Sequence, residues 1–258
     1  VTIGTVNGPH VELGMYPFAS VAWAWDTIWA AVHTRSAWTP ETLTRSGDVH
    51  ARWYDSNCLI THVCGWPFAA LHRSDMHLIG AFALEIPEAD GGHYRSVLLS
   101  PHQLSLDELV LAQTHAVANS ADSLSGWFSL LATTVGSAGQ WPGNVTYTSA
   151  HHDSLVALAK GKADIASIDS WSLALIAAEE PELVAGLHRV ALGPRIPTPA
   201  ITARRSILPD QLDELRQTFI DALADPVTSD ARAALRIKGF ADNRLDDYLA
   251  ILPLGLTS

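Results

Sequence analysis

Short apolar runs of strand length alternate with helical hydrophobic patterns along most of the chain. Between the first two runs, Val21, Trp25, Ile28, Trp29 and Val32 fall on one face of a helix. This alternation predicts an α/β fold of parallel sheets with helices on both faces. From 209 to 250 the pattern predicts two or three helices with no strand between them. The predicted strands are 10–16, 57–63, 77–86, 94–100, 114–120, 144–149, 163–169 and 188–193.

Two segments have the composition of crossings between lobes. Residues 87–93 are acidic and rich in glycine, and residues 193–199 hold three prolines. A chain that leaves one lobe and later returns needs two such crossings. They predict one lobe from 1–92 and 194–258 and a second lobe from 93–193. A single domain with two surface loops would show the same pattern.

Composition and charge narrow the class of ligand and partner. The chain has 258 residues, of which 48% are hydrophobic and 17% charged, so a packed core is expected and disorder is excluded. Its formal net charge of -11 argues against nucleic acid or an anionic membrane as partner, because both need a basic surface. The negative net charge opposes an anionic ligand, so the local geometry of a site would have to hold such a ligand against this repulsion. The longest apolar stretch, 18–32, is too short to span a bilayer and carries Asp26.

Cysteine and histidine give no sign of a metal or a cofactor. Cys58 and Cys64 are the two cysteines, and an extended chain would hold them about 20 Å apart, beyond disulfide reach. The twelve histidines do not form a zinc-binding spacing such as HExxH. The sequence therefore predicts no resident metal and no cofactor.

Two strand-to-helix junctions, 119–126 and 148–154, are rich in hydroxyl groups. Hydroxyls and free backbone N–H groups at a helix start make a site for an anion, although serine and aspartate are also ordinary N-cap residues. Asp122 and Asp153 would repel a phosphate unless they face away. Asp169, at the end of the next predicted strand, could pair with an ammonium group or cap the following helix.

Seven short motifs follow one another along the chain: Met15-Tyr16, 59–67, Tyr94-Arg95-Ser96, 119–126, 148–155, 161–169 and 197–202. Together, in this order, they resemble the phosphonate/phosphate/phosphite-binding family of periplasmic proteins. That family has the type 2 periplasmic-binding-protein fold. The chain departs from its pattern at His62-Val63, where the family has Gln-Thr, and at Ser149-Ala150, where it has glycine and serine.

The resemblance implies a two-lobed (Venus flytrap) architecture in which each lobe is a mostly parallel sheet flanked by helices. It implies the substrate-binding component of an ABC importer, which captures a small oxyanion such as a phosphonate, a phosphate ester or phosphite and delivers it to a membrane permease. No cofactor and no enzymatic activity are implied. A periplasmic location with a removed signal peptide is also implied, and a cytoplasmic location stays open.

The resemblance also implies the residues that hold the ligand. Ser123, Ser125, His151 and Ser154 are the expected oxyanion contacts, Tyr16 and Tyr94 line the mouth of the site, and Asp169 faces the ligand's substituent. The 59–67 motif adds His62 and Trp66 to this set.

Three alternatives remain open from the sequence. The same fold could bind a zwitterionic or aromatic heterocyclic nutrient, with the junction aspartates and Trp66 and Trp127 as contacts. The protein could be a ligand sensor that partners a signalling protein. A hydrolase that uses His151, Asp169 and a nearby serine would need these three groups in hydrogen-bond contact.

Overall fold

The computed structural model describes residues 8–45, 48–134 and 140–255. Its tertiary contacts group the chain into two compact units. Unit 1 holds the residues up to Glu85 together with Pro197–Tyr248, and unit 2 holds Ile86–Ile196 together with the residues from Leu249 on. Two of these divisions fall in or next to the predicted crossings at 87–93 and 193–199. The third differs from the prediction, which left 249–258 in the first lobe: α11 (Leu252–Gly255) packs on η3 (Leu124–Phe128) of unit 2.

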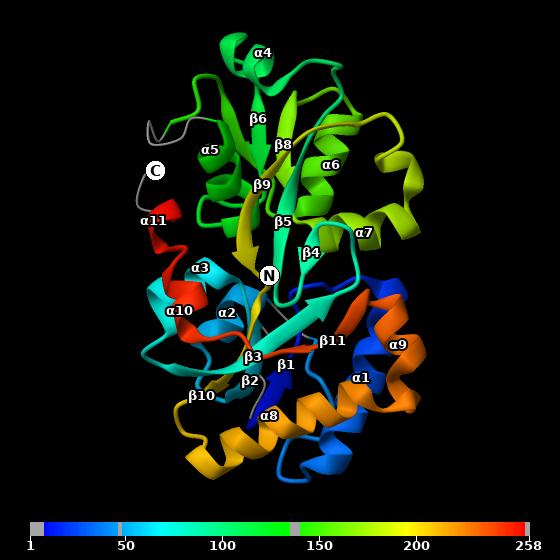
Figure 1. Cartoon of the computed structure of the whole chain (residues 1–258), viewed down its shortest axis with the longest axis vertical. Coiled ribbons are helices and arrows are strands. Elements are labelled where there is room, and N and C mark those ends of the chain that lie inside the picture. Colours follow the sequence, from blue (N-terminus) through cyan, green and yellow to red (C-terminus); the bar gives the residue numbers. More distant parts are fainter. Residues whose placement is uncertain (1–7, 46–47, 135–139, 256–258) are drawn as a thin grey trace. The chain divides into compact units, whose positions relative to one another are not determined.

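The sheet of unit 1 has five strands in the order β1-β2-β10-β3-β11 (Figure 1). β1 and β2 pair in parallel, but β10 runs antiparallel to both β2 and β3, and β11 runs antiparallel to β3. The prediction of a mostly parallel sheet is therefore wrong for unit 1, and so is the prediction of no strand between 209 and 250. The strands are β1 (His10–Glu12), β2 (Cys58–Val63), β3 (Met76–Leu84), β10 (Ala200–Arg204) and β11 (Ile237–Ala241).

The helices of unit 1 bury their apolar faces against this sheet and against each other. α1 packs on α8 and α9, and α8 packs on β3 and β11. The helical face predicted at Val21, Trp25, Ile28, Trp29 and Val32 is confirmed, because all five side chains are buried. The helices are η1 (Ala19–Val21), α1 (Ala22–Arg35), α2 (Val49–Tyr54), α3 (Gly65–Pro67), η2 (Phe68–His72), α8 (Pro209–Ala224), η6 (Pro226–Thr228), α9 (Ser229–Ala234) and α10 (Leu245–Leu249).

A buried arginine ties β10 to the segment before β2. The Arg204 side chain donates hydrogen bonds to the backbone carbonyls of Cys58, Arg52, Trp53 and Asp55, at 2.6 to 3.1 Å. Four carbonyl acceptors satisfy a charge that would otherwise be costly to bury. A charged residue can therefore stand in a central strand.

The sheet of unit 2 has the order β4-β5-β8-β6-β7, with β9 paired to β5 (Figure 1). β6 pairs in parallel with β7 and with β8, whereas β5 runs antiparallel to β4 and to β8. The sheet is therefore mixed, with a parallel half that carries helices at its strand ends. Its strands are β4 (Ala89–Asp90), β5 (His93–Ser100), β6 (Ala116–Ala118), β7 (Val145–Tyr147), β8 (Ile165–Ile168) and β9 (His188–Pro197).

Helices flank the sheet of unit 2 and follow its parallel strands. η3 continues directly into α5, α6 packs on β6 and β8, and α7 packs on α6 and β5. Each of these helices begins within a few residues of a strand end, so their N-termini lie near one edge of the sheet. The helices are α4 (Leu106–Leu111), η3, α5 (Ser129–Thr134), α6 (His151–Ala159), α7 (Ser170–Glu179), η5 (Pro181–Leu183) and α11.

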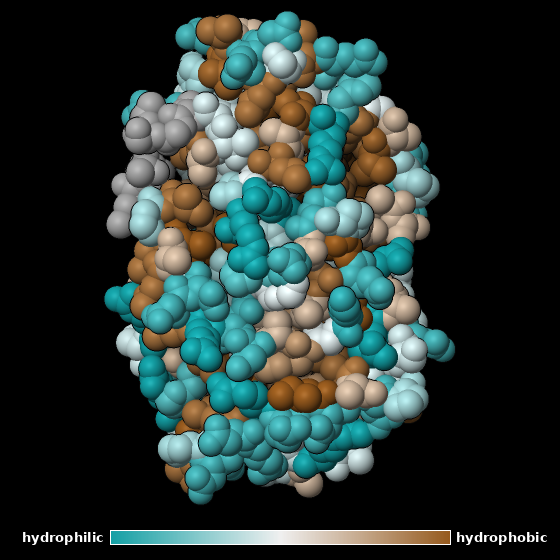
Figure 2. Space-filling model, viewed as in Figure 1, coloured by the Kyte–Doolittle hydropathy of each residue, from teal (hydrophilic) through white to brown (hydrophobic). Residues whose placement is uncertain are grey.

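The surface carries mixed polarity. Figure 2 shows hydrophilic and apolar residues interspersed over the face that it draws.

Among the residues that the structure describes, none of the helices has the length and apolar character needed to cross a bilayer. The same residues contain no cluster of three or more His, Cys, Asp or Glu side chains arranged to hold a metal ion, and no disulfide joins Cys58 to Cys64.

Candidate functional site

The carboxyl ends of three parallel strands bring the predicted junctions of unit 2 together. β6, β7 and β8 pair in parallel, so Asn119, Thr148 and Asp169, which follow them, lie at one edge of the sheet. β5 runs antiparallel to β8 with Val97 opposite Ile168, which places the start of β5 at the same edge. Ligands of open α/β sheets bind at such an edge, where strands end and helices begin.

Tyr94 and Asp169 meet at this edge. The Tyr94 hydroxyl donates a hydrogen bond of 2.6 Å to Asp169 Oδ2, and both side chains are buried. Asp169 also caps α7, because its Oδ1 accepts a 2.6 Å hydrogen bond from the backbone N–H of Ser172. The carboxylate therefore holds Tyr94 and the start of α7 in one place.

The turn that begins η3 is built around Ser123 and Gly126. Ser123 is the N-cap, and its Oγ accepts a 3.0 Å hydrogen bond from the backbone N–H of Gly126. A Cβ at position 126 would overlap Asn119 Oδ1, so only glycine lets the Asn119 side chain lie over this turn. Ser167 Oγ donates a 2.7 Å hydrogen bond to the carbonyl of Ser125, which fixes η3 to β8. η3 is a π-helical turn, a wide form that is common at functional sites.

Ser125 and His151 form a pair between the starts of η3 and α6. Ser125 Oγ lies 3.1 Å from His151 Nε2, and either atom can be the donor. Burial lowers the pKa of His151, against a smaller opposite effect of the Asp169 charge, so the ring is neutral at pH 7. Its Nδ1 is buried and has no hydrogen-bond partner among the described residues. One ring nitrogen is thus available to a ligand.

The start of α6 has no side-chain cap. Its N-cap is Ala150, which cannot accept a hydrogen bond from the N–H groups of the first turn. Those groups carry the positive end of the helix dipole. Ser149, just before, adopts a left-handed backbone with φ of 76°, which costs about 1–2 kcal/mol for a residue other than glycine. Ser154 Oγ lies 2.7 Å from Thr148 Oγ1 and 3.3 Å from the Ala150 carbonyl, so it supports this loop.

The carboxylates of the two junction aspartates, Asp122 and Asp153, contact neighbouring side chains of the same junctions. Asp122 Oδ1 accepts a 2.7 Å hydrogen bond from Ser120 Oγ. The Asp153 side chain is 58% exposed and lies 3.5 Å from His152 Nδ1. Solvent screens a charge in such a position, so the expected repulsion between Asp153 and a bound anion is small.

The predicted site residues of unit 1 are Tyr16, His62 and Trp66. Tyr16 is buried and lines a pocket, and its carbonyl accepts a 3.3 Å hydrogen bond from Trp25 Nε1. Trp66 is half-buried in α3. His62 lies in the core, fully buried, with Nε2 3.2 Å from the Pro199 carbonyl. Its ring centroid is 5.9 Å from that of Tyr16. This position argues against direct contact with a ligand and favours support of Tyr16.

Two further residues, Asn119 and Thr148, begin the predicted junctions 119–126 and 148–154 but were not among the expected ligand contacts. Asn119 Oδ1 is buried and lacks a hydrogen-bond partner among the described residues, and Thr148 holds Ser154. Both follow a strand directly, which is the signal that could have included them. The six predicted residues of unit 2 gather at one edge; the three of unit 1 lie on β1–α1 and at the end of β2.

Comparison with solved structures identifies the fold class. The chain is similar to a binding protein component of an ABC phosphonate transporter from Pseudomonas aeruginosa, at 16% identity over 96% of this chain and 85% of that one, with a TM-score of 0.79. A phosphonate-binding protein from Prochlorococcus marinus in complex with methylphosphonate gives 11% identity over 96% and 97% of the two chains, with a TM-score of 0.77. A Xanthomonas citri protein bound to chloride gives 14% identity, 97% and 96% coverage and a TM-score of 0.70. The fold is therefore that of the two-lobed type 2 periplasmic binding proteins.

A family model assigns the chain more closely. Residues 58–248 match the family described as the phosphonate-binding periplasmic substrate-binding protein of ABC transporters. The chain belongs to this family, as the motifs from Met15 to Thr202 predicted. Comparison with curated proteins finds no match.

Proposed function

We propose that this protein captures a small phosphorus oxyanion, a phosphonate, phosphite or phosphate ester, and delivers it to an ABC permease. The observation that carries the proposal is the start of α6, whose first-turn N–H groups have no side-chain cap and lie beside the Ser125–His151 pair. Backbone N–H groups, a hydroxyl and a ring N–H are donors that suit an oxyanion. Such local donors are needed because the net charge of -11 opposes an anion.

The geometry favours binding over hydrolysis. In a Ser–His–Asp triad the carboxylate accepts a hydrogen bond from the imidazole Nδ1. His151 Nδ1 has no such partner among the described residues, and the Asp169 oxygens accept from Tyr94 and Ser172. The Ser125–His151 pair is therefore suited to donate to an anion and lacks the group that would orient a general base. Turnover of activated esters that is lost in His151→Ala would contradict this assignment.

Titration against a panel of anions tests the ligand class. We expect saturable one-to-one binding of at least one of methylphosphonate, phosphite and phosphate in isothermal titration calorimetry. Malate and adipate serve as comparison anions, because solved proteins of similar fold hold them. Planar carboxylates present two oxygens, whereas a tetrahedral phosphorus group presents three to the donors of α6 and η3. Silence of all three phosphorus anions, or tighter binding of a dicarboxylate, would reject the proposal.

A further inference from the structure

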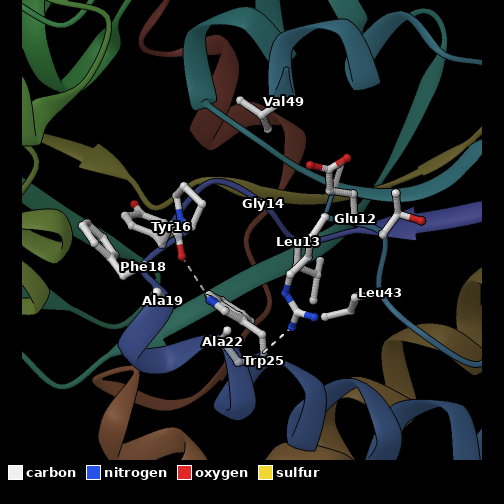
Figure 3. A pocket seen from close by; sticks show the side chains of 13 residues that line it. Glu12, Leu13, Gly14, Tyr16, Phe18, Ala19, Ala22, Trp25, Leu43 and Val49 are labelled. Carbon is white, nitrogen blue, oxygen red and sulfur yellow. Dashed lines mark hydrogen bonds between the residues drawn. The ribbon is translucent and has the colours of Figure 1, made fainter. Parts of the chain in front are cut away.

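A pocket of about 510 Å³ lies within unit 1, and Tyr16 is the predicted site residue among its described lining residues. The loop after β1, the start of α1, residues 43–45 and Val49 surround it. In Figure 3, Tyr16 and Phe18 lie on one side of the pocket, Glu12 and Leu43 on the other, and Trp25 below. Its size is in the range of small-molecule sites, and its walls are mainly apolar and aromatic. Among the described residues that line it, Glu12 and Arg45 are charged.

The carboxylate of Glu12 is the buried polar group of this pocket. Glu12 is 4% exposed, and its Oε2 accepts no hydrogen bond from the described residues, although Arg52 Nε lies 3.2 Å away. Gly14 makes room for it, because a Cβ at position 14 would lie 2.6 Å from Glu12 Oε1. Burial raises the pKa of Glu12 to about 7, although the Arg52 charge acts in the opposite direction. The pair with Arg52 therefore does not compensate for the lost hydration of this carboxylate.

The charges around the pocket favour a cation. Arg45 is already neutralised, since its guanidinium lies 2.7 Å from Asp26 Oδ1 and 2.9 Å from the Ala22 carbonyl. Arg52 is shared between Glu12 and Asp55, whose Oδ2 is 3.3 Å from Arg52 Nη1. Two carboxylates thus face one guanidinium, and His10 Nε2 lies 3.6 Å from Asp55 Oδ2. A cation that enters would restore to Glu12 the charge-assisted hydrogen bond that it lacks.

We propose that this pocket binds a small organic ammonium ion, with its nitrogen at Glu12 and its apolar or aromatic body against Tyr16 and Trp25. Aromatic walls also attract cations through the ring quadrupole. The proposal goes beyond capture of an oxyanion and does not depend on it, because the lining residues all belong to unit 1.

Benzylamine is a suitable probe, with benzyl alcohol as its neutral and benzoate as its anionic counterpart. In calorimetric titrations of the full chain at pH 8 and low salt, we expect benzylamine to bind at least ~10-fold more tightly than benzyl alcohol, as one charge-assisted hydrogen bond predicts. Benzoate should bind more weakly than either. Equal affinities for the three, no saturable binding of benzylamine, or tightest binding of benzoate would overturn the proposal.

Two variants place the binding in this pocket. Glu12→Gln keeps the shape of the side chain and leaves Arg52 its Asp55 partner, so it should remove the preference for benzylamine while benzyl alcohol binds as before. Leu43→Trp leaves the Glu12–Arg52 pair intact and fills the pocket, so it should weaken both probes. Leu111→Trp, at an exposed position of α4 in unit 2, is the matched control and should change neither.

Titration of methylphosphonate on the same variants separates the two proposals. Glu12→Gln should bind methylphosphonate as the wild type does, whatever happens to benzylamine. Ser125→Ala should retain benzylamine binding in full. A benzylamine preference that survives Glu12→Gln and is lost in Ser125→Ala would assign the ammonium to the oxyanion site and overturn the proposal for unit 1.

Discussion

Simultaneous replacement of Ser125 and Ser154 by alanine is expected to weaken methylphosphonate binding by ~10²–10⁴-fold, since hydrogen bonds to charged groups contribute about 1.5–3 kcal/mol each. Ser125 Oγ lies beside His151 at the start of η3, and Ser154 Oγ lies beside Thr148 at the start of α6. The family motifs predict both hydroxyls as oxyanion contacts, so we count one hydrogen bond to the ligand for each. Calorimetric titration of the double variant and of each single variant measures the loss.

The single variants separate direct from indirect action. Ser154 is bonded to the loop before α6, so Ser154→Ala should also loosen that loop and lower the melting temperature, whereas Ser125→Ala should act mainly on affinity. Ser105→Ala is a matched control in the same unit. Ser105 caps α4 and forms a capping box with Glu108, so its loss costs about 1 kcal/mol of stability without a change in affinity. Unchanged methylphosphonate affinity in the double variant would place the ligand elsewhere.

Acid is expected to destabilise the fold through His62, by about 4–5 kcal/mol between pH 6.5 and pH 3. Burial lowers the pKa of His62 from 6.5 to about 3, although the hydrogen bond to the Pro199 carbonyl acts in the opposite direction. As the pH falls below 6.5, the unfolded chain takes up a proton that the folded chain accepts only near pH 3. The contribution of His62 to stability is therefore complete above pH 6.5 and is lost progressively on the way down.

Urea unfolding at several pH values measures this effect. His62→Gln can still donate to Pro199 but does not titrate, so its free energy of unfolding should depend less steeply on pH than that of the wild type. Comparing the two proteins cancels the other titrating groups, including Glu12. Phe82→Leu is the control, because its ring centroid lies 5.4 Å from that of His62 and it carries no titrating group. Phe82→Leu should lower the free energy of unfolding equally at each pH. An equally steep pH dependence of this free energy in His62→Gln and the wild type would contradict the prediction.

The sequence predicted most strands of the fold because their apolar runs end at turn-forming residues. The eight predicted strands overlap β1, β2, β3, β5, β6, β7, β8 and β9. β10 was missed because it follows Pro197-Thr198-Pro199 and ends in Arg204, whose buried charge is explained only by distant carbonyls. β11 was missed because it is the last strand of its sheet and is mostly half-exposed. An edge strand has little hydrophobic pattern for a sequence to reveal.

The candidate site was predictable as far as it depends on strand ends. Asp169 and the 148–154 junction follow β8 and β7, and parallel pairing with β6 brings them to one edge. The hydrogen bond between Tyr94 and Asp169 was not predictable, because it depends on the antiparallel register of β5 with β8. The burial of His62 was missed for a related reason. Alternation along β2 does not show that both faces of the strand are covered, as they are at Ile60, Thr61, His62 and Val63.

A crystal structure of the protein with methylphosphonate tests the central claim most directly. The claim is that the starts of η3 and α6 hold the oxyanion. We predict phosphonate oxygens within hydrogen-bond distance, about 2.6–3.2 Å, of Ser125 Oγ, of a His151 ring nitrogen and of first-turn N–H groups of α6. A phosphonate bound elsewhere, with these donors in contact with water or with each other, would contradict the account.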